Sequence, residues 1–369
     1  MKKVGIITLH YPLNYGSALQ TYALQQSLRD RLIDVEIINY LMPYDFEKYK
    51  TFRVRIYKNR PQAFIADILY FRSNIKRKKN FEKFHQKYLH ITEEKFYSNE
   101  DIEKLNSKFD GYICGSDQIW NFDCTNGVDK AYFLDFAADD KLLAAYAPSM
   151  AQNNFNFDYE EQIKDLLKRF DFLSVREESS RKLVQGLVDK PVKVVCDPTF
   201  LLPASSYRSM SIAPKISDNY IFVYMLEYNE QLINYANWLS EESRLPIRYI
   251  SNISRRAEKE FTSGYSSFGV GPEEFLGLID AASYIVTNSF HATIFSILMH
   301  KQFVVFKTQK SYPRLVDLLQ RFDLSDRIFS SAFDMDNSIN YLSVDQKVCD
   351  YVSESSDYLE KIVERLKKQ

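Results

Sequence analysis

Short apolar runs rich in β-branched and aromatic residues alternate with amphipathic segments along most of the chain. The first run is Val4–Leu9, which is followed by a polar loop, an amphipathic segment at Ser17–Leu32 and a second apolar run at Val35–Ile38. Runs of this kind are typical of buried parallel strands, and the amphipathic segments are typical of the helices that cover them. The order strand, helix, strand predicts the opening of a doubly wound α/β domain.

The same alternation continues and then starts again after residue 204. Further strands of the first series are expected at Tyr112–Cys114, Leu142–Tyr146, Asp171–Val175 and Val192–Cys196. The second series is expected to contain strands at 220–226, 247–251 and 284–286, helices at 230–242, 273–282, 294–299 and 314–322, and a further strand ending near Phe306. Leu202–Ser205 is interpreted as the start of a linker and Arg255–Gly269 as a loop.

This pattern predicts two α/β domains. A chain of 369 residues exceeds a single ordinary core and suits two domains of typical size. We place the first domain at 1–204, with a basic helical insertion at about 44–97, and the second at 205–369. A final helix at about 355–368 is expected to return over both domains.

Composition narrows the class of protein. Apolar residues make up 45% of the chain and charged residues 26%, which is typical of globular proteins. The four cysteines form no CxxC pair and have no ligand spacing, so neither a disulfide framework nor a metal site is predicted. Lys2 and Lys3 lead directly into a strand, and no long apolar stretch follows. We therefore expect a cytoplasmic protein.

Charge is distributed unevenly. The net charge is −1, but residues 48–87 contain thirteen Lys or Arg and two acidic residues, or 13 − 2 = +11, so the remainder carries −1 − 11 = −12. This basic segment is consistent with a solvated helical excursion, with attraction of nucleic acid or with contact to an anionic membrane. No nucleic-acid motif accompanies the charge. Aromatic residues within it favour peripheral contact with the inner membrane face: Phe52, Tyr57, Phe64, Tyr70, Phe71, Phe81 and Phe84.

The strongest candidate for chemistry is His291. It follows the strand at 284–286 and stands where the next helix begins, after the potential capping residues Thr287, Asn288 and Ser289. The carboxyl ends of strands in an open α/β sheet are where ligands bind, and the N–H groups of a helix N-terminus favour anions. A capping histidine within the core is the alternative interpretation.

Polar residues follow three strands of the first series. Ser116 and Asp117 come directly after Tyr112–Cys114, and Arg176 follows Asp171–Val175. Asp117 is placed to accept a proton or merely to cap the following turn. Arg176 is placed to bind a carboxylate or phosphate through two parallel hydrogen bonds, or to form an ion pair with Glu177 or Glu178. After the first strand, the loop residues Asn14, Tyr15 and Gly16 either face a ligand or form a plain β–α turn.

Several motifs together resemble one known family. They are NYGSALQTYAL at 14–24, GSDQIWN at 115–121, YAPSMA at 146–151, SVREESS at 174–180, CDPTFLL at 196–202 and TNSFHATIFSIL at 287–298. Their order and spacing are similar to those of the polysaccharide pyruvyl transferases of bacterial surface-glycan loci. The resemblance extends from Val4 to about Arg327.

The resemblance implies a fold and a reaction. It implies two Rossmann-like domains facing across a cleft, as in GT-B glycosyltransferases. It also implies transfer of the enolpyruvyl group of phosphoenolpyruvate to two hydroxyls of one sugar, which gives a cyclic pyruvate ketal. No cofactor or metal is implied beyond this co-substrate. A GT-B glycosyltransferase that uses a nucleotide sugar and a non-catalytic scaffold of glycan assembly are the alternatives.

Site roles follow by position. Arg176 matches the family's phosphoenolpyruvate-binding arginine, and His291 matches its histidine. Ser289 stands where many relatives carry an arginine, so Lys307, Lys310 or Arg314 is expected to supply the cation to the donor. His291 is expected to act as acid, base or phosphate ligand, because its pKa is ordinarily near neutrality. Asp117 is the candidate base on the acceptor side, with Ser116 and Asn14–Gly16, and the acceptor is expected to be linked to a lipid diphosphate.

Overall fold

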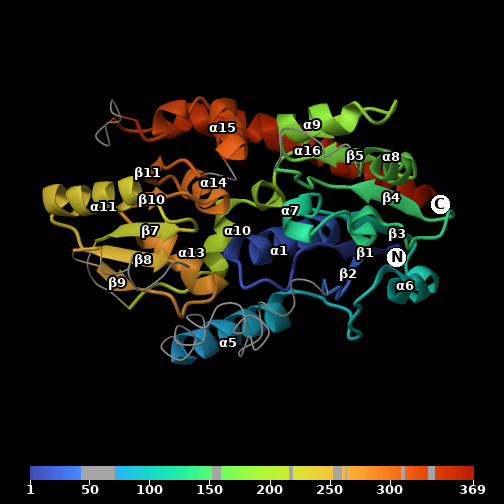
Figure 1. Cartoon of the computed structure of the whole chain (residues 1–369), viewed down its shortest axis with the longest axis horizontal. Coiled ribbons are helices and arrows are strands. Elements are labelled where there is room, and N and C mark those ends of the chain that lie inside the picture. The colour runs from blue at the N-terminus through green and yellow to red at the C-terminus, as the bar shows by residue number, and fades with distance from the viewer. Residues whose placement is uncertain are drawn as a thin grey trace. The chain divides into compact units, whose positions relative to one another are not determined.

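The computed structural model describes residues 1–42, 71–151, 159–215, 219–251, 260–262, 264–308, 312–330 and 337–369. The chain divides into two compact units (Figure 1). Unit 1 comprises Met1–Lys50, His85–Leu202 and Val348–Gln369, and unit 2 comprises Thr51–Phe84 and Pro203–Lys347. Each unit contains a parallel sheet flanked by helices, so the chain is an α/β protein as its sequence predicts.

Unit 1 is built on a parallel sheet with strand order β2-β1-β3-β4. These strands are β1 (Lys3–Ile7), β2 (Asp34–Ile37), β3 (Gly111–Cys114) and β4 (Leu142–Ala145). Val4 of the central strand β1 is in register with Val35 on one side and Gly111 on the other. Every strand ends within one or two residues of the boundary that the apolar runs predict, because each run stops where polar, glycine or proline residues begin.

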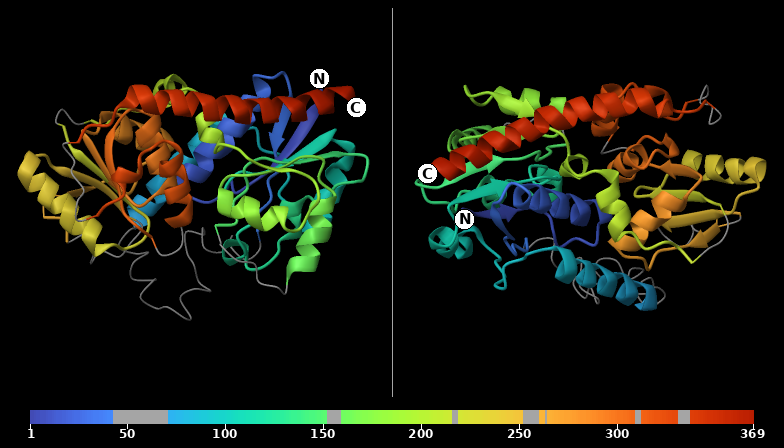
Figure 2. Two further views of the ribbon diagram at one scale, coloured as in Figure 1. Left: turned by 90° about the horizontal axis from the view of Figure 1, so that it is seen from above. Right: turned by 180° about the vertical axis from the view of Figure 1, so that it is seen from behind.

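Alternate residues of β3 pack into two hydrophobic clusters on opposite faces of the sheet, as expected for a strand buried on both faces. Ile113 packs in a cluster with Leu359 and Ile362 of α16 (Tyr341–Lys368) and with residues of α1 (Tyr15–Arg29). Tyr112 and Cys114 face the opposite cluster, which contains Trp120 and Phe133. Figure 2 shows α16 running across the sheet of unit 1.

The remaining elements of unit 1 extend this framework. β5 (Leu173–Val175) and β6 (Val192–Val194) form a parallel pair, and a bridge from Ala144 to Phe172 connects it to β4. The helices are α6 (Asn99–Ile102), η2 (Glu103–Ser107), α7 (Phe122–Thr125), η3 (Lys130–Phe133), α8 (Glu160–Lys168), α9 (Glu178–Gln185) and η5 (Pro198–Leu201). As a result, the carboxyl ends of β1, β3, β4 and β5 lie on one edge of the unit.

Unit 2 contains a parallel sheet with strand order β11-β10-β7-β8-β9. Its strands are β7 (Ile221–Met225), β8 (Ile247–Ser251), β9 (Gly264–Ser266), β10 (Tyr284–Thr287) and β11 (Gln302–Val305). Its helices are α10 (Ala204–Met210), α11 (Glu230–Ser243), α13 (Pro272–Ala281), α14 (Phe290–Leu298), α15 (Tyr312–Arg321) and η6 (Ser325–Arg327). On β7, Ile221 and Val223 pack with α11, whereas Phe222 and Tyr224 contact Phe275 of α13.

The division of the chain differs from a single boundary after residue 204 in two respects. Residues 71–84 of the basic segment belong to unit 2 rather than to the first domain, and α16 belongs to unit 1 from Val348 onward. The basic helix α5 (Phe71–Tyr88) is attached to unit 2 because Asn80 donates to the Gly269 carbonyl at 3.1 Å. α16 joins unit 1 because Leu359 and Ile362 enter its core.

Three elements depart from the predicted local structure. The expected linker contains helix α10 from Ala204, and the expected loop at 255–269 contains the edge strand β9. β9 is only three residues long and begins with glycine, which is depleted in strands, so it gives almost no sequence signal. Gly264 is required there because a Cβ atom would lie 2.8 Å from the Tyr249 ring. α16 begins at Tyr341, well before the expected start at about 355.

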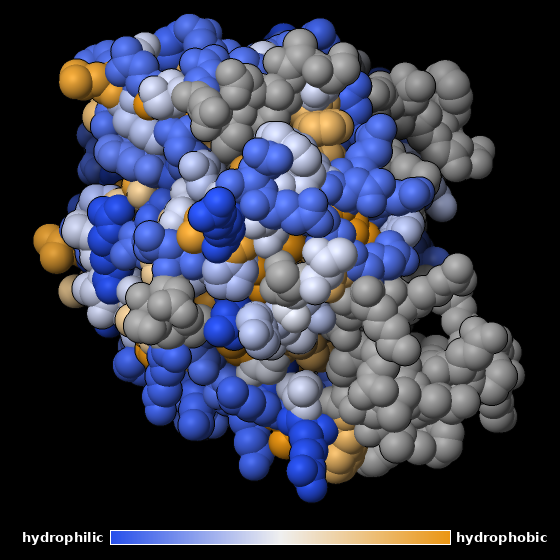
Figure 3. Space-filling model, turned by 90° about the vertical axis from the view of Figure 1, so that its left-hand side faces the viewer, coloured by the Kyte–Doolittle hydropathy of each residue, from blue (hydrophilic) through white to orange (hydrophobic). Residues whose placement is uncertain are grey.

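The surface offers no membrane-spanning element in the part of the chain that is described. None of the described helices is both long enough and apolar enough to cross a bilayer. The side of the molecule shown in Figure 3 is mostly hydrophilic, with scattered hydrophobic residues. Such scattered residues are ordinary for a protein surface.

Candidate functional site

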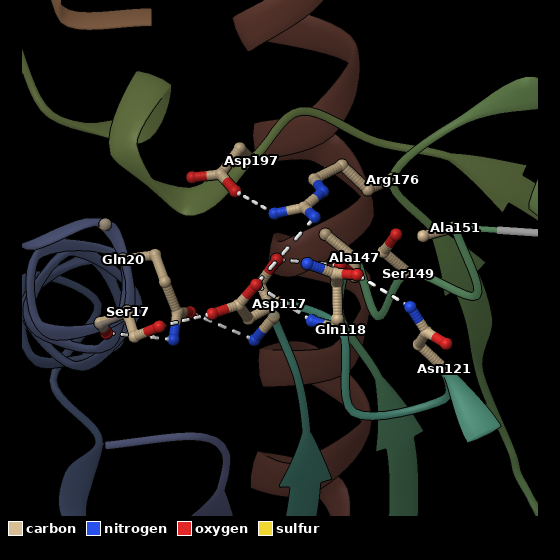
Figure 4. Close-up of polar contacts among 12 residues, drawn as sticks. Ser17, Gln20, Asp117, Gln118, Asn121, Ala147, Ser149, Ala151, Arg176 and Asp197 are labelled. Carbon is tan, nitrogen blue, oxygen red and sulfur yellow. Dashed lines mark hydrogen bonds and ion pairs between the residues drawn. The ribbon is translucent and has the colours of Figure 1, made fainter. Parts of the chain in front are cut away.

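Asp117 is the centre of a polar network at the carboxyl edge of the unit 1 sheet (Figure 4). Its Oδ2 atom accepts a hydrogen bond of 2.5 Å from Ser17 Oγ, in the first turn of α1, and its Oδ1 atom accepts from the Gln118 amide at 2.9 Å. The carboxylate is almost completely buried. It is therefore held in one orientation by residues a hundred positions apart in the sequence.

The backbone at this point adopts conformations that ordinary residues avoid. Asp117 has φ +69° and Gly115 has φ +125°. At Gly115 a Cβ atom would lie only 2.0 Å from the Tyr146 carbonyl oxygen, so only glycine fits. The Ser149 amide donates to the Asp117 carbonyl at 2.8 Å and helps to hold the turn. Strained backbone of this kind is concentrated at functional sites.

Arg176 lies at the end of β5 among three carboxylates. Its Nη1 donates to Asp197 Oδ2 at 2.8 Å, its Nη2 is 3.9 Å from Asp117 Oδ1, and its Nε is 3.7 Å from Glu177 Oε2. Burial would lower the pKa of the guanidinium, but the charges of Asp197, Asp117 and Glu177 outweigh burial and raise that pKa. Arg176 is therefore a permanent cation.

The strongest ion pair of Arg176 was not among those predicted. Glu177 lies close to Arg176, as one of the two predicted ion pairs requires. Glu178, the other predicted partner, pairs with Arg181 instead. The shortest contact is with Asp197, which follows β6. The signal in the sequence was the position of Asp197 directly after a strand, where its side chain also accepts from the Thr199 amide at 3.1 Å.

Glu177 is also fixed by several hydrogen-bond donors. Its Oε1 atom accepts from Ser149 Oγ at 2.8 Å, from Ser180 Oγ and from the Ala151 amide at 3.4 Å. One arginine and the three carboxylates of Asp117, Glu177 and Asp197 have formal charges of +1 and −3, or −2 in total, when all are ionised. Because this group is negatively charged as a whole, it should attract hydroxyl and amide hydrogen-bond donors and repel additional anions.

The other predicted residues of unit 1 have well-defined places. Ser116 is buried, and its Oγ donates to the Ala147 carbonyl at 2.7 Å. Asn14 caps α1, because its Oδ1 accepts from the Gly16 amide at 2.9 Å. Tyr15 is completely buried in the core. Asn14 is thus the cap of α1 and Gly16 lies in the first turn of that helix, and Ser17, which follows them, reaches Asp117.

In unit 2, polar residues at the end of β10 tie that strand to the end of β7. Thr287 Oγ1 donates to the Tyr224 carbonyl at 2.6 Å. Asn288 Oδ1 accepts from the Leu226 amide at 2.8 Å, and its Nδ2 donates to the Glu227 carbonyl at 2.7 Å. Of the three predicted capping residues, Thr287 and Asn288 therefore hold the sheet edge.

Ser289 is the cap of α14, and His291 lies in the first turn of that helix. Ser289 Oγ accepts from the Ala292 amide at 3.4 Å, and Thr293 Oγ1 donates to the Ser289 carbonyl at 2.9 Å. The His291 side chain is 8% exposed and its ring makes an edge contact with Phe290 at 5.4 Å between centroids. His291 is thus placed at a helix N-terminus that follows a strand, as predicted.

The three cations considered for the donor have different positions. Arg314, in α15, is buried, and its Cζ atom lies 5.5 Å from the ring centroid of Phe290, the neighbour of His291. Lys307 is exposed after β11. Lys310 lies outside the described residues. Arg314 is therefore the candidate that the structure brings to the beginning of α14.

Metal ligands do not gather at either site in the described residues. No group of three or more His, Cys, Asp and Glu side chains within them is arranged to hold an ion. In unit 1 the Arg176 guanidinium occupies the position between the carboxylates.

Known structures establish the fold class. The UDP-GlcNAc 2-epimerase of Neisseria meningitidis bound to UDP-GlcNAc is similar over 100% of both chains, with a TM-score of 0.53 and 9% identity. The UDP-GlcNAc 2-epimerase of Methanocaldococcus jannaschii has a TM-score of 0.52 and 14% identity, over 96% of this chain and 92% of that one. These are GT-B enzymes, so the GT-B-like class that the sequence predicts is confirmed.

Sequence comparison supplies the family. A search of curated proteins finds no significant match. In contrast, the family model described as polysaccharide pyruvyl transferase matches residues 14–310. This range includes Asp117 and Arg176 in unit 1 and His291 in unit 2. The chain therefore belongs to the polysaccharide pyruvyl transferase family.

Proposed function

We propose that the protein transfers the enolpyruvyl group of phosphoenolpyruvate to two hydroxyls of one sugar in a surface-polysaccharide precursor. The observation that carries this proposal is the family match across 14–310. In the reaction, two C–O bonds form at C2 of the donor and the C2–O bond to phosphate breaks. One hydroxyl proton ends on C3, which becomes a methyl group, and the other leaves with phosphate. No oxidant or reductant is needed.

The donor has two anionic groups, a carboxylate and a phosphate. Such a ligand is matched by helix N-terminal N–H groups and by a fixed cation. We assign the donor to the beginning of α14, with Ser289, His291 and Arg314 as its contacts. The support is the buried guanidinium of Arg314 at 5.5 Å from the Phe290 ring. Lys307 and Lys310 remain further candidates for a phosphate contact.

His291 is proposed to move a proton or to bind the transferred phosphate. C3 of the donor must be protonated and the sugar hydroxyls must lose their protons, so an imidazole, which can both donate and accept a proton, is useful at this position. General acid–base catalysis of this kind is worth about 10²–10⁴-fold in rate. Replacing His291 with Asn should lower kcat by a factor in this range.

Asp117 is proposed as the base for an acceptor hydroxyl. Ser17 and the Gln118 amide orient its carboxylate, and the excess negative charge around Arg176 favours neutral hydroxyl donors. Because Arg176 is surrounded by Asp197, Asp117 and Glu177, we assign it first to the orientation of Asp117. Its direct contact with the donor, which the family pattern implies, is tested by the KM for phosphoenolpyruvate in an Arg176→Lys variant.

The test is an acceptor screen with the purified chain. Phosphoenolpyruvate is incubated with free galactosides and with lipid-diphosphate-linked galactosides, and both phosphate and the ketal methyl group are measured, the latter by NMR. Formation of the two products in equal amounts supports the proposal. Turnover of a UDP-sugar without phosphoenolpyruvate would identify a glycosyltransferase instead. Absence of turnover across the whole panel would favour a non-catalytic scaffold.

A histidine pair provides the matched control. His300 is also in unit 2, but it is exposed and pairs with Asp345 at 2.9 Å. His300→Asn should keep full activity, whereas His291→Asn should lose it without unfolding. A fully active, folded His291→Asn enzyme would remove the catalytic assignment and leave the family membership untouched.

A further inference from the structure

The basic helix α5 carries a single row of cations on one side. Its exposed residues include Arg72, Lys76, Lys79, Lys83 and Lys87, which we call the basic row. At 100° per residue these five positions fall within about 80° of the helix circumference, and they extend over roughly 22 Å along its axis. Arginine and lysine thus recur at the spacing that places them all on the same face.

The side of α5 next to the basic row is attached to the protein. Phe81 and Phe84 are completely buried, and the buried Arg77 guanidinium lies 4.9 Å from the ring centroid of Phe268. Asn80 Nδ2 donates to the Gly269 carbonyl and to Glu274, both at 3.1 Å. These contacts fix the rotation of α5 about its axis, so the basic row faces outward.

This packing corrects one expectation from the sequence. Phe81 and Phe84 were expected to favour contact with an apolar surface, but they fill the interior of the protein. Phe71 is 39% exposed, and Phe52, Tyr57, Phe64 and Tyr70 lie outside the described residues. The described part of the basic segment therefore presents charged side chains rather than a continuous apolar face. If it contacts a surface, the contact is electrostatic, so salt should weaken it.

Few opposite charges neutralise the basic row. α5 contains seven Lys or Arg and one acidic residue, Glu82, so its charge is 7 − 1 = +6. Glu82 lies on the flank, where it is 4.0 Å from Lys78. Within the described ranges, no carboxylate is at ion-pair distance from the four residues Arg72, Lys76, Lys79 and Lys83.

We propose that the basic row docks the protein on an anionic membrane surface. A flat, negatively charged surface can contact all five cations of a straight helix at once. The chain outside 48–87 carries −12, and a nucleic acid long enough to extend past α5 would meet that negative charge. A membrane meets only the face turned toward it. This inference does not depend on the proposed reaction.

The expected strength follows from charge alone. Each Lys or Arg near an anionic leaflet contributes roughly fivefold to binding, and the attraction decays over about 8 Å at physiological ionic strength. Five such residues give reversible binding that salt weakens. Docking raises the concentration of lipid-linked sugars around the protein but not that of soluble sugars. The two kinds of acceptor should therefore react at different rates when anionic vesicles are present.

The experiment measures co-sedimentation of the full chain with vesicles. One set contains phosphatidylcholine alone and the other also contains phosphatidylglycerol. The chain should bind the second set and not the first, and added salt should release it. Replacing Arg72, Lys76 and Lys79 with Gln should weaken binding on the order of 100-fold. Replacing Lys76 and Lys79 with Arg should leave binding intact.

A second triple variant is the matched control. Lys361, Arg365 and Lys368 of α16 are exposed and have the same spacing and the same composition of one Arg and two Lys. Their replacement by Gln removes the same charge, and binding should stay as in the parent chain. The proposal is wrong if both triple variants lose binding equally, if neutral vesicles bind as well, or if only nucleic acid binds. Circular dichroism verifies that each variant is folded.

Discussion

The polar network around Asp117 in unit 1 and the β10–α14 junction in unit 2 both follow parallel strands, yet they are held together differently. In unit 1 the important bonds join charged side chains to one another, as between Arg176 and Asp197 at 2.8 Å. In unit 2 they join side chains to the backbone, as between Asn288 and the two residues that follow β7. In a network of buried charges, the loss of one member leaves the others without their partner. A side-chain bond to the edge of a sheet can be lost without affecting the other bonds there.

This difference predicts that substitutions in unit 1 affect stability more than those in unit 2. The two tryptophans allow each unit to be followed separately, because Trp120 is buried in unit 1 and Trp238 lies on α11 in unit 2. A Trp238→Phe background leaves Trp120 as the reporter of unit 1, and a Trp120→Phe background leaves Trp238 as the reporter of unit 2. The predictions below use these backgrounds.

The largest effect is expected for Arg176→Met. This change leaves Asp117, Glu177 and Asp197 buried without their cation, and removing one partner of a buried pair costs about 3–5 kcal/mol. The free energy of unfolding is measured in urea from the fluorescence of Trp120. Arg181→Met is the control, because its pair with Glu178 lies near the surface, with side chains 34% and 41% exposed, and such pairs contribute about 1 kcal/mol or less. Equal effects of the two changes would show that the buried network around Arg176 contributes no more to stability than an ion pair near the surface.

A smaller loss of stability is expected for Asp197→Asn. The amide oxygen can still accept a hydrogen bond from Arg176, and the formal charge of the network falls from −2 to −1. Loss of a hydrogen bond to a charged group is worth about 1.5–3 kcal/mol, and the relief of repulsion offsets part of it. Asp165→Asn, at an exposed pair with Lys168, should have almost no effect. If Asp197→Asn lowered the free energy of unfolding as much as Arg176→Met does, repulsion among the carboxylates around Arg176 would not contribute to stability.

Acid should destabilise unit 1 through His10, which is buried, and His85, which is partly buried. Burial lowers the pKa of His85 from 6.5 to about 3, and burial also lowers the pKa of His10. The unfolded chain therefore binds protons below pH 6.5 that the folded chain does not. Stability is fully present above pH 6.5 and, for His85, falls by about 1.4 kcal/mol per pH unit as the pH decreases toward 3. His10 contributes a loss in the same direction.

The variant His85→Gln isolates one of these contributions. Urea unfolding of unit 1 between pH 7 and pH 4.5, followed by Trp120, should show a shallower dependence than in the parent chain by about one proton per molecule. An unchanged slope would show that His85 is protonated in the folded state, and the pH sensitivity would then have to come from elsewhere in unit 1.

The smallest effects are expected at the two helix caps. Asn14 accepts from the Gly16 and Ser17 amides at 2.9 and 3.3 Å, whereas Ser289 accepts from the Ala292 amide at 3.4 Å. Replacing a cap with Ala costs about 1 kcal/mol on average. Asn14→Ala should therefore destabilise unit 1 more than Ser289→Ala destabilises unit 2, each measured with its own tryptophan. The reverse order would show that cap geometry does not govern these helices.

Much of the fold follows from local sequence. Apolar runs bounded by polar or glycine residues predict β1, β3, β7 and β10, because burial of a strand on both faces requires nearly continuous apolar residues. The position of a polar residue after such a run, as at Asp117 and His291, is also local information. Family motifs spread over the chain then supply the class of reaction.

Tertiary structure alone determines which of these residues meet. Ser17 reaches Asp117 and Arg176 reaches Asp197 only because parallel strands bring their carboxyl ends to one edge. The rotation of α5 about its axis is a second example. The sequence shows the charge of this helix, but only the structure shows that the face with Phe81 and Phe84 is buried. Periodicity encodes the conformation of each segment, whereas pairing between distant segments depends on the register and packing of the whole sheet.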